Sequence, residues 1–299
     1  MSVVKRGVGF LLFLCFIWLT LQFVDKATFG QVWGEIISSP SMLAIITVTY
    51  TGAFISRGIA WRFYSGVEGR WASYLVPLYY SLFFNHLLPF KAGDLIRIGV
   101  YQQFTKTTWK SAASDVIVMR SLDLFCLAVL AIIGTGVYIS PSYWWVLIGI
   151  ASGGLLFVIL LRWKGVPSWL NTPIRLIATR KGVLIVGLVA ISWILEGYVL
   201  YGFLSMLDWK GTVFESLWAT SVAVASGVFQ ITPGNLAAYE SVMTGALVAV
   251  GLPVTSAYLI ALTTHIYKFI YSFAFGILVI ILFPISFSGV KEWLKERVN

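Results

Sequence analysis

Charged residues are scarce in this sequence. Of its 299 residues, only 11% are Asp, Glu, Lys or Arg, while 59% are hydrophobic. Soluble domains average about 25% charged residues and about 45–50% apolar residues. Because so few charges could not cover that much apolar surface in water, the composition excludes a cytosolic enzyme and a disordered chain. It predicts a protein with several membrane crossings of about 20 residues each.

Cysteine and histidine are also nearly absent. The two cysteines, Cys15 and Cys126, lie in apolar runs, so we expect packing residues and neither a disulfide nor a metal site. The two histidines are His86 and His265. With so few thiol and imidazole groups, we expect no zinc site, no His-rich metal cluster and no cofactor.

The charges that are present are mostly basic, with 21 Lys and Arg against 12 Asp and Glu. In a membrane protein, this surplus indicates cytoplasmic loops in contact with anionic lipid, not nucleic acid. A cytoplasmic N-terminus puts 15 basic residues in cytoplasmic segments, including Arg57 at the end of the second span, and only Lys26 and Lys210 outside. The sequence therefore predicts a multi-pass protein of the cytoplasmic (inner) membrane with both termini in the cytoplasm.

The apolar runs predict an all-α integral membrane fold, with about six full spans and two broken or re-entrant helical hairpins. The full spans are expected at 7–24, 41–64, 110–139, 143–161, 182–207 and 255–284, and the hairpins at 71–104 and 212–250. A polar loop is expected over 25–40, and residues 289–299 suit a helix on the membrane surface. We expect the whole chain, 1–299, to form one polytopic membrane domain.

The two hairpins share an order of features. A Gly-Asp-Leu motif at 93–95 and a Gly-Asn-Leu motif at 234–236 each precede a long span with a polar pair at i, i+3. By the charge-derived topology the first hairpin starts from inside and the second from outside. This arrangement predicts an inverted repeat, about 41–139 and about 182–284, as in secondary transporters. Chance similarity between Gly-rich apolar segments is the alternative.

The first break has the residues that end one helix and start another. Pro89 and Gly93 disfavour a continuous helix, and Asp94 is a suitable N-cap for a helix that begins near Leu95. A helix that starts inside a membrane has unpaired N–H groups, which favour an anion such as a lipid phosphate. Arg97, on the first turn, would bind that phosphate. In the alternative interpretation, Asp94 caps the break itself and no ligand is involved.

Charges at membrane depth cost about 2.5–3.5 kcal/mol each on insertion scales. Arg120 and Asp123 can neutralise each other on one helix face, either as a structural pair or within a site. Glu240 and Lys268 have no charged partner nearby in the sequence, which indicates a pair between helices or a ligand contact. Glu196 is either a proton carrier or hydrogen-bonded to neighbouring backbone.

The remaining polar residues of these segments have simpler interpretations. We expect Asn85 and His86 to be polar partners of the broken backbone, Lys91 to extend toward the membrane surface, and His265 to be a core histidine or a proton relay. The predicted substrate-binding residues are Asn85, Gly93, Asp94, Arg97, Arg120, Asp123, Gly234, Asn235, Glu240, His265 and Lys268, with Glu196 and Glu240 as candidates for a proton relay. No catalytic residue is predicted.

Two runs of residues resemble signatures of the lysylphosphatidylglycerol synthase transmembrane (flippase-like) family. The first signature is carried by Asn85, Pro89, Gly93, Asp94 and Arg97, followed by Arg120 and Asp123. The second runs from Pro233 to Glu240, followed by Gly251. The resemblance covers about 5–283 and implies a multi-pass inner-membrane protein that moves a lipid between leaflets or helps to move it.

The sequence departs from the family pattern in two places. The family often has an arginine shortly before the glutamate of the second signature, whereas residues 237–239 here read Ala-Ala-Tyr, which weakens any claim of headgroup binding there. The chain ends at Asn299, so the soluble synthase domain, and with it lysine transfer to lipid, is not expected.

Three functions are compatible with these features. We expect a translocase that carries an anionic phospholipid or a polyprenyl-phosphate lipid, with the phosphate held by arginines at the broken helices. The alternative is a membrane-embedded enzyme or an accessory subunit in lipid-linked glycan or phospholipid synthesis, but no nucleophile triad, nucleotide loop or carboxylate cluster is found. Besides membrane lipids, a cytoplasmic synthase docking on the basic loop 162–181 is a candidate partner.

Overall fold

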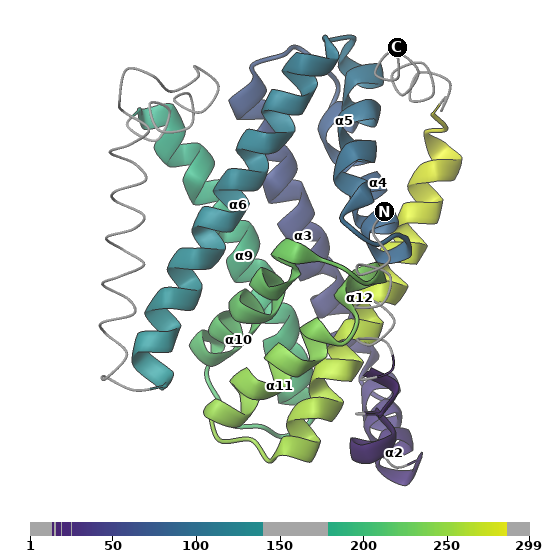
Figure 1. Cartoon of the computed structure of the whole chain (residues 1–299), viewed down its shortest axis with the longest axis vertical. Helices are drawn as coiled ribbons and strands as arrows, with labels where there is room; N and C mark the ends of the chain where they lie inside the picture. The colour runs from purple at the N-terminus through teal and green to yellow at the C-terminus, as the bar shows by residue number, and fades with distance from the viewer. Residues whose placement is uncertain (1–13, 15, 19, 25, 140–178, 286–299) are drawn as a thin grey trace.

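The computed structural model describes residues 14–285, apart from 15, 19, 25 and 140–178 (Figure 1). In this part of the chain every regular element is a helix, which confirms the predicted all-α class. The predicted span 143–161, the surface helix 289–299 and most of the basic loop 162–181 lie outside the described residues. Of the predicted first span, the described residues between 14 and 23 are helical.

Four helices are long and apolar enough to cross a membrane. They are α3 (Pro40–Ser65), α6 (Trp109–Tyr138), α9 (Arg180–Met206) and α12 (Val254–Leu282). Their 26 to 30 residues correspond to about 39–45 Å of helix, more than the hydrocarbon thickness of about 30 Å. Each begins and ends within two residues of a predicted span. The chain is therefore a multi-pass membrane protein.

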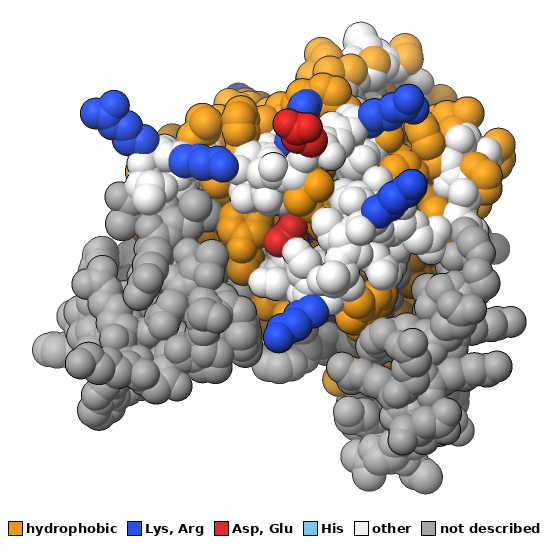
Figure 2. Space-filling model, turned by 90° about the horizontal axis from the view of Figure 1, so that it is seen from above, with side chains coloured by type: hydrophobic (Ala, Val, Ile, Leu, Met, Phe, Trp, Pro, Cys, Tyr) orange, Lys and Arg blue, Asp and Glu red, His pale blue; other side chains and the backbone are white. Residues whose placement is uncertain are grey.

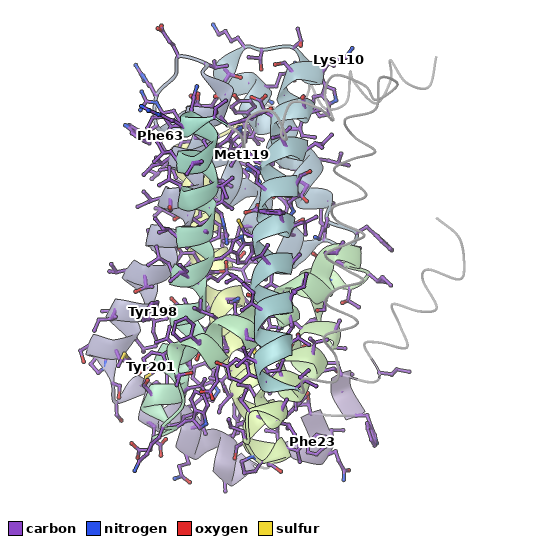
Figure 3. All side chains as sticks on the ribbon, turned by 90° about the vertical axis from the view of Figure 1, so that its left-hand side faces the viewer. Phe23, Phe63, Lys110, Met119, Tyr198 and Tyr201 are labelled. Atoms are coloured by element: carbon purple, nitrogen blue, oxygen red, sulfur yellow. The ribbon has the colours of Figure 1, made fainter. Side chains whose placement is uncertain are left out.

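The long helices present large apolar side chains outward. Phe63 is 44% exposed and Tyr198 43% exposed, and in the side view both lie on the outer surface, whereas Met119 is only 2% exposed (Figure 3). On α6, Ile117, Phe125, Ile133 and Val137 are also exposed. Exposed apolar side chains on every long helix are what lipid contact requires.

The axis of the bundle is the packing of α3 against α9. A Cβ at Gly202 would meet the Ile46 side chain, so glycine lets the two helices approach closely there. The Ser56 hydroxyl donates to the Leu188 carbonyl oxygen at 2.8 Å and fixes their register. This packing brings the middle of α3 and the middle of α9 to the same depth.

The first hairpin consists of α4 (Ala72–Leu87) and α5 (Ala92–Thr105). Phe90 and Lys91 have φ values of 60° and 50° at the break, so the chain reverses through left-handed backbone. The prediction that Asp94 is the N-cap is wrong, because α5 begins two residues earlier, after Lys91. As a consequence Arg97 lies on the second turn of α5 and not on the first.

The second hairpin consists of α10 (Val213–Ser226) and α11 (Ala238–Ala249), joined by two short 3-10 turns, η2 (Gly227–Phe229) and η3 (Pro233–Asn235). Thr212 and Glu215 form a capping box that starts α10. At the break Gly234, Asn235 and Ala237 all have φ above +60°. The motif at 234–236 therefore marks a break, as predicted, but the new helix begins only at Ala238.

The two hairpins enter from opposite ends of the bundle and meet at their tips (Figure 1). The Gln230 side-chain amide donates to the carbonyl oxygens of Asn85 at 2.6 Å and Leu88 at 3.4 Å. The Phe90 backbone N–H donates to the Gln230 carbonyl oxygen at 3.1 Å. In the sequence each hairpin lies between two long helices, α3 and α6 for the first and α9 and α12 for the second. The order of elements is therefore the same in both halves of the chain. That the two halves form an inverted repeat stays a prediction.

The segment after the first span is a helix and not the polar loop that we expected. Helix α2 spans Lys26–Ile37. Its apolar residues Phe29, Val32, Trp33 and Ile36 follow a helical spacing, and Val32 and Ile36 are buried in the main core. The few apolar residues between the polar ones were thus sufficient for a helix packed against the bundle.

One end of the bundle is strongly basic. Figure 2 views this end, where α3 and α5 finish and α6 and α9 begin, and shows Lys and Arg side chains spread across it. The basic residues there are Arg62, Arg70, Lys106, Lys110, Arg180 and Lys181. The turn between α9 and α10 at the opposite end carries Lys210.

Candidate functional site

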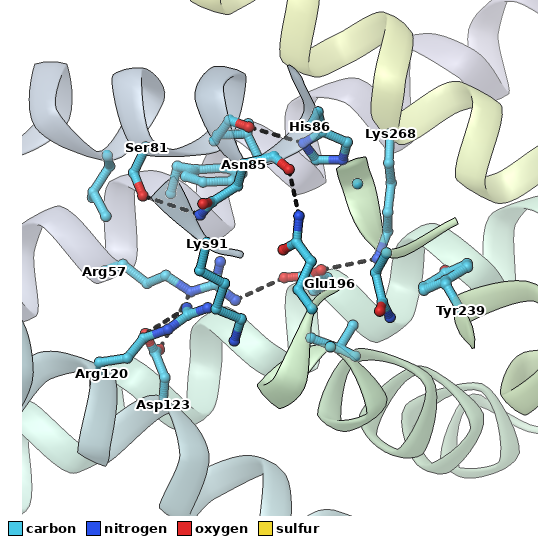
Figure 4. A pocket seen from close by; sticks show the side chains of 18 of the residues that line it. Arg57, Ser81, Asn85, His86, Lys91, Arg120, Asp123, Glu196, Tyr239 and Lys268 are labelled. Atoms are coloured by element: carbon cyan, nitrogen blue, oxygen red, sulfur yellow. Dashed lines mark hydrogen bonds and ion pairs between the residues drawn. The ribbon is translucent and has the colours of Figure 1, made fainter. Parts of the chain in front are cut away.

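A cavity of about 170 Å³ lies where the tips of both hairpins meet the long helices (Figure 4). Its lining combines many polar and charged side chains with apolar ones, which include Phe54, Leu78, Leu82 and Val224. The polar and aromatic lining residues are Tyr50, Arg57, Ser81, Asn85, His86, Lys91, Arg97, Arg120, Asp123, Trp193, Glu196, Gln230, Asn235, Tyr239, His265 and Lys268. Such a concentration of ionisable groups inside a membrane bundle is the mark of a functional site.

Six charged side chains of alternating sign form a continuous series, which we call the ion-pair chain. In order they are Asp94, Arg120, Asp123, Arg57, Glu196 and Lys268. The first three links are loose: Arg120 Nε lies 3.5 Å from an Asp94 oxygen, Arg120 Nη1 lies 3.8 Å from one Asp123 oxygen, and Arg57 Nε lies 3.7 Å from the other. The predicted i, i+3 pairing of Arg120 and Asp123 is therefore present.

The second part of the ion-pair chain is tighter and deeper. Arg57 Nη2 lies 2.7 Å from one Glu196 oxygen, and Lys268 Nζ lies 2.9 Å from the other. The side chains of Arg57, Glu196 and Lys268 are each no more than 11% exposed. One carboxylate from α9 thus makes an ion pair with a cation from α3 and with a cation from α12.

Arg57 is one residue of this site that the sequence analysis assigned wrongly. It was counted among the cytoplasmic charges at the end of a span, but it is buried in α3, eight residues before the helix ends. Its guanidinium also stacks on Trp193 at 4.1 Å and donates from Nε to the Ser192 hydroxyl at 3.1 Å. The signal that could have found it is its flanks, because residues 54–61 are otherwise apolar or small.

Arg97 lines the same cavity but takes no part in the ion-pair chain. It is 3% exposed, and its guanidinium carbon lies 4.2 Å from the centre of the Trp61 ring. Among the described residues its Nε has no hydrogen-bond partner. A buried cation held by stacking alone keeps its N–H donors for another partner.

Lys91 lies at the mouth of the cavity. It is only partly buried, it stands at the break of the first hairpin, and Figure 4 shows it beside Arg120. Its side chain lines the cavity, so the expectation that it extends toward the membrane surface is not what the structure shows. The cavity therefore has five basic side chains in its lining and two carboxylates, Asp123 and Glu196.

Glu240 and His265 form a separate pair behind the cavity. Nδ1 of His265 lies 2.7 Å from one Glu240 oxygen, and the other oxygen accepts the Ala237 backbone N–H at 2.8 Å. Glu240 is 1% exposed and does not line the cavity, whereas the His265 ring does. Of the two alternatives for Glu240 and Lys268, a pair between helices is therefore present and a ligand contact is not required. Glu240 pairs with His265 and Lys268 pairs with Glu196, so the two residues do not pair with each other.

Asn85, Gly93 and Asp94 hold the first break together. The Asn85 carboxamide oxygen accepts the Gly93 N–H at 2.9 Å, and an Asp94 carboxylate oxygen accepts from the Ser81 hydroxyl at 3.0 Å. A Cβ at Gly93 would overlap the Ser81 carbonyl oxygen. Asn85 is thus a partner of the broken backbone, as predicted, while His86 bonds the Leu82 carbonyl of its own helix. Since Asn85 already occupies the Gly93 N–H, that group is not available to an anion.

Gly234 and Asn235 have comparable structural roles at the second break. Gly234 has a φ of 61° and packs so closely on the Phe269 ring that a Cβ would overlap it. The Asn235 amide donates to the Ser226 hydroxyl at 3.0 Å. Both residues line the cavity. Of the other site residues predicted from the sequence, seven also line it: Asn85, Arg97, Arg120, Asp123, Glu196, His265 and Lys268. Three do not line it: Gly93, Asp94 and Glu240.

Sequence reasoning also missed Tyr50, Gln230 and Tyr239 in the lining. Aromatic and amide residues are common in apolar helices, so their types alone gave no signal. In the described part of the chain no three His, Cys, Asp or Glu side chains gather as a metal site would require.

Comparison with known proteins gives one positive result. A family model described as "Lysylphosphatidylglycerol synthase TM region" matches residues 7–276, nearly the whole chain. No curated protein and no solved structure matches significantly. The match includes both hairpins, all four long helices except the end of α12, and every residue of the cavity lining.

Proposed function

The chain belongs to the lysylphosphatidylglycerol synthase TM region family, and we propose that it carries a lipid with an anionic phosphate headgroup between the two leaflets of the cytoplasmic membrane. The lipid class is an anionic phospholipid or a polyprenyl phosphate. In this proposal the chain acts as a carrier and not as an enzyme, and the phosphate is held in the central cavity.

The observation that carries the proposal is the excess of positive charge in that cavity. Five basic side chains line it, and three carboxylates pair with them, Asp123 and Glu196 from the lining and Asp94 from outside it. Buried charges without partners are costly, and a membrane adds to that cost. An anionic headgroup would offset the excess, and arginine offers the paired N–H donors that suit phosphate oxygens.

The size of the cavity agrees with a headgroup and not with a whole lipid. A volume of about 170 Å³ is below the roughly 300–1,000 Å³ of pockets that enclose drug-sized ligands. A phosphate group could enter while its hydrocarbon chains stay among the exposed apolar side chains of the long helices. Transport in this form moves only the polar part of the lipid through protein.

The hairpins supply a means of access from either side. Their helices have 12 to 16 residues, about 18–24 Å, so each ends inside the hydrocarbon region. We propose that small shifts of one hairpin against the other expose the cavity to one leaflet at a time. Asp94, Asp123 and Glu240 would hold the hairpins in position or exchange protons during these shifts.

The basic end supports a direction for the molecule in the membrane. The positive-inside rule places a surface with Arg62, Arg70, Lys106 and Lys110 on the cytoplasmic side. We propose, with this orientation, that both termini are cytoplasmic. We propose a cytoplasmic lipid-modifying enzyme as the protein partner. It would deliver its lipid product to the carrier at this basic surface.

The test is transport by the purified full chain in proteoliposomes. Acyl-labelled fluorescent phosphatidylglycerol is incorporated, and dithionite added outside bleaches only the outer leaflet. A second set of vesicles contains a short-chain polyprenyl phosphate and is treated with an external phosphatase. We expect faster loss of label, or more phosphate release, than in protein-free vesicles for at least one of these lipids, and no such effect with labelled phosphatidylcholine.

Two variants refine this test. Arg120→Gln removes a cation from the cavity and should slow transport at least tenfold, whereas Lys110→Gln, at the exposed start of the same helix, should not. Transport no faster than in empty vesicles for every anionic lipid would overturn the proposal. Chemical conversion of a labelled lipid by the protein alone would favour the enzyme alternative.

A further inference from the structure

The charges around the cavity do not balance, and the imbalance has a definite size. The ion-pair chain contains three carboxylates and three cations, so it is neutral as a whole. Two further cations line the cavity, Arg97 and Lys91. Neither makes an ion pair with any residue of the described part of the chain. The cavity therefore has two positive charges in excess of its own partners.

Glu240 is not a contact partner of either of these two cations. Its two carboxylate oxygens are already engaged, one by His265 and one by the Ala237 N–H, and it does not line the cavity. Asp94 is engaged in the same way by Arg120, Ser81 and Asn85. The remaining demand for negative charge is in the cavity itself, around Arg97.

Arg97 is constructed as a binding group and not as a structural one. Its guanidinium stacks on Trp61, a side chain with no measurable exposure, which fixes the plane of the fork. Stacking occupies the flat face of the guanidinium, whereas its N–H groups point outward in the guanidinium plane. Of these groups, Nε–H has no hydrogen-bond partner among the described residues. A fixed fork with free donors is the geometry that binds two oxygens of one phosphate.

We infer that the cavity prefers a phosphate monoester to a phosphate diester, and that Arg97 sets this preference. A terminal phosphate has three free oxygens and a charge of about −1.5 to −2 at pH 7, whereas a diester has two free oxygens and a single charge. A monoester would match both unpaired cations; a diester would leave one of them unpaired. The inference rests on the proposed function and narrows its substrate to lipids that end in a phosphate, such as a polyprenyl phosphate.

The preference can be measured by binding, separately from transport. The full chain in nanodiscs of phosphatidylcholine is titrated with dodecyl phosphate, with dodecyl methyl phosphate, and with inorganic phosphate, and its intrinsic tryptophan fluorescence and melting temperature are followed. Trp61 and Trp193 stack on arginines of the cavity, so a ligand there alters their environment. Dodecyl phosphate and its methyl ester share a chain and differ only in ester state.

We expect dodecyl phosphate to bind at least tenfold more tightly than dodecyl methyl phosphate at pH 7.5, in line with one additional charge-assisted contact. Inorganic phosphate distinguishes a lipid site from a site for free phosphate: it should bind more weakly than dodecyl phosphate by a further factor of ten or more. Inorganic phosphate binding as tightly as dodecyl phosphate would contradict a lipid substrate.

Three variants assign the preference. Arg97→Gln should reduce the monoester-to-diester ratio to below about threefold, and Arg97→Lys, which keeps the charge but not the planar guanidinium, should reduce the ratio less. The matched control is Arg62→Gln. Arg62 also stacks on a tryptophan, Trp71 at 4.4 Å, but outside the cavity, so its loss should leave the ratio unchanged.

The outcomes separate this inference from the proposed function. Equal binding of monoester and diester, together with transport of phosphatidylglycerol, would refute the preference and leave the carrier function standing. An unchanged ratio in a folded Arg97→Gln protein would refute the role of Arg97. Failure of both ligands to bind, with no transport of any lipid, would refute the proposed function itself.

Discussion

Glu196 and Lys268 face each other at 2.9 Å in the middle of the bundle, although they are 72 residues apart in the sequence. The second oxygen of the Glu196 carboxylate is bonded to Arg57 at 2.7 Å. A single side chain of α9 therefore pairs with two buried cations, one on the helix before the first hairpin and one on the helix after the second. This arrangement makes Glu196 the residue on which the stability of the site depends most.

Glu196→Gln should destabilise the protein by about 3 kcal/mol, because removing one partner of a buried ion pair leaves uncompensated charge, here on both Arg57 and Lys268. The measurement is the unfolding midpoint in detergent. Glu35→Gln on α2 is the control, since Glu35 is exposed and bonds only Gln31 at 3.4 Å; its effect should stay within about 0.5 kcal/mol. Equal midpoints for the two variants would contradict a dependence on Glu196.

Gly93→Ala should destabilise the first hairpin by about 1–3 kcal/mol, because the added methyl group overlaps the Ser81 carbonyl oxygen and the Asn85 carboxamide. Gly245→Ala on α11 is the matched control, since nothing lies within 4 Å of a Cβ there. In that helix interior alanine should be neutral or stabilising by up to about 1 kcal/mol. Thermal unfolding of the two purified variants decides the comparison, and a stabilised Gly93→Ala protein would show that the hairpin is less tightly closed than described.

Gln230→Leu should weaken the contact between the hairpin tips. The variant removes the donor to the Asn85 and Leu88 carbonyl oxygens while it keeps a side chain of similar size. Leaving a buried carbonyl without its partner costs about 1–3 kcal/mol. Hydrogen exchange of peptides covering 85–92 should increase, while Gln31→Leu on the exposed face of α2 should leave these peptides unchanged. No difference in exchange between the two variants would mean that the tips are held by other contacts.

Labelling of single cysteines tests the orientation. In a chain with Cys15 and Cys126 replaced by serine, Ser111→Cys reports the basic end and Lys210→Cys the opposite end, and both positions are exposed. In intact cells a membrane-impermeant thiol reagent should label Lys210→Cys but should label Ser111→Cys only after permeabilisation. The reverse pattern would invert the orientation that the basic residues indicate.

The long helices were predictable because a membrane imposes a length. Runs of about 20 apolar residues have few alternatives, so the four described spans agree with their helices to within two residues. The breaks were predictable because Pro, Gly and a polar residue occur together at 89–94 and at 233–235, whereas the isolated Pro77 is accommodated inside α4. The N-cap of α5 was not predictable from the sequence. It is Lys91, which adopts a left-handed backbone conformation that non-glycine residues rarely adopt, and α5 therefore begins before Asp94.

The charged partners of the site could be predicted only where they are local. Arg120 and Asp123 are one turn apart, so their pairing follows from helix geometry. Glu196 pairs across 139 and 72 residues with Arg57 and Lys268, and no spacing rule reports such contacts. Arg57 was misassigned because a rule that counts basic residues near span ends does not distinguish a charge eight residues inside the helix from one at its end.

The tip-to-tip joint between the hairpins has a consequence for the membrane as an electrical insulator. The hairpin helices are shorter than the four spanning helices, and their tips are joined by Gln230, Asn85 and Phe90, so we expect the barrier to ions to lie at this seam. In the function that we propose, a charged headgroup passes through that seam, while protons and sodium must not follow it. The seam must therefore re-form behind each lipid before it opens ahead of it.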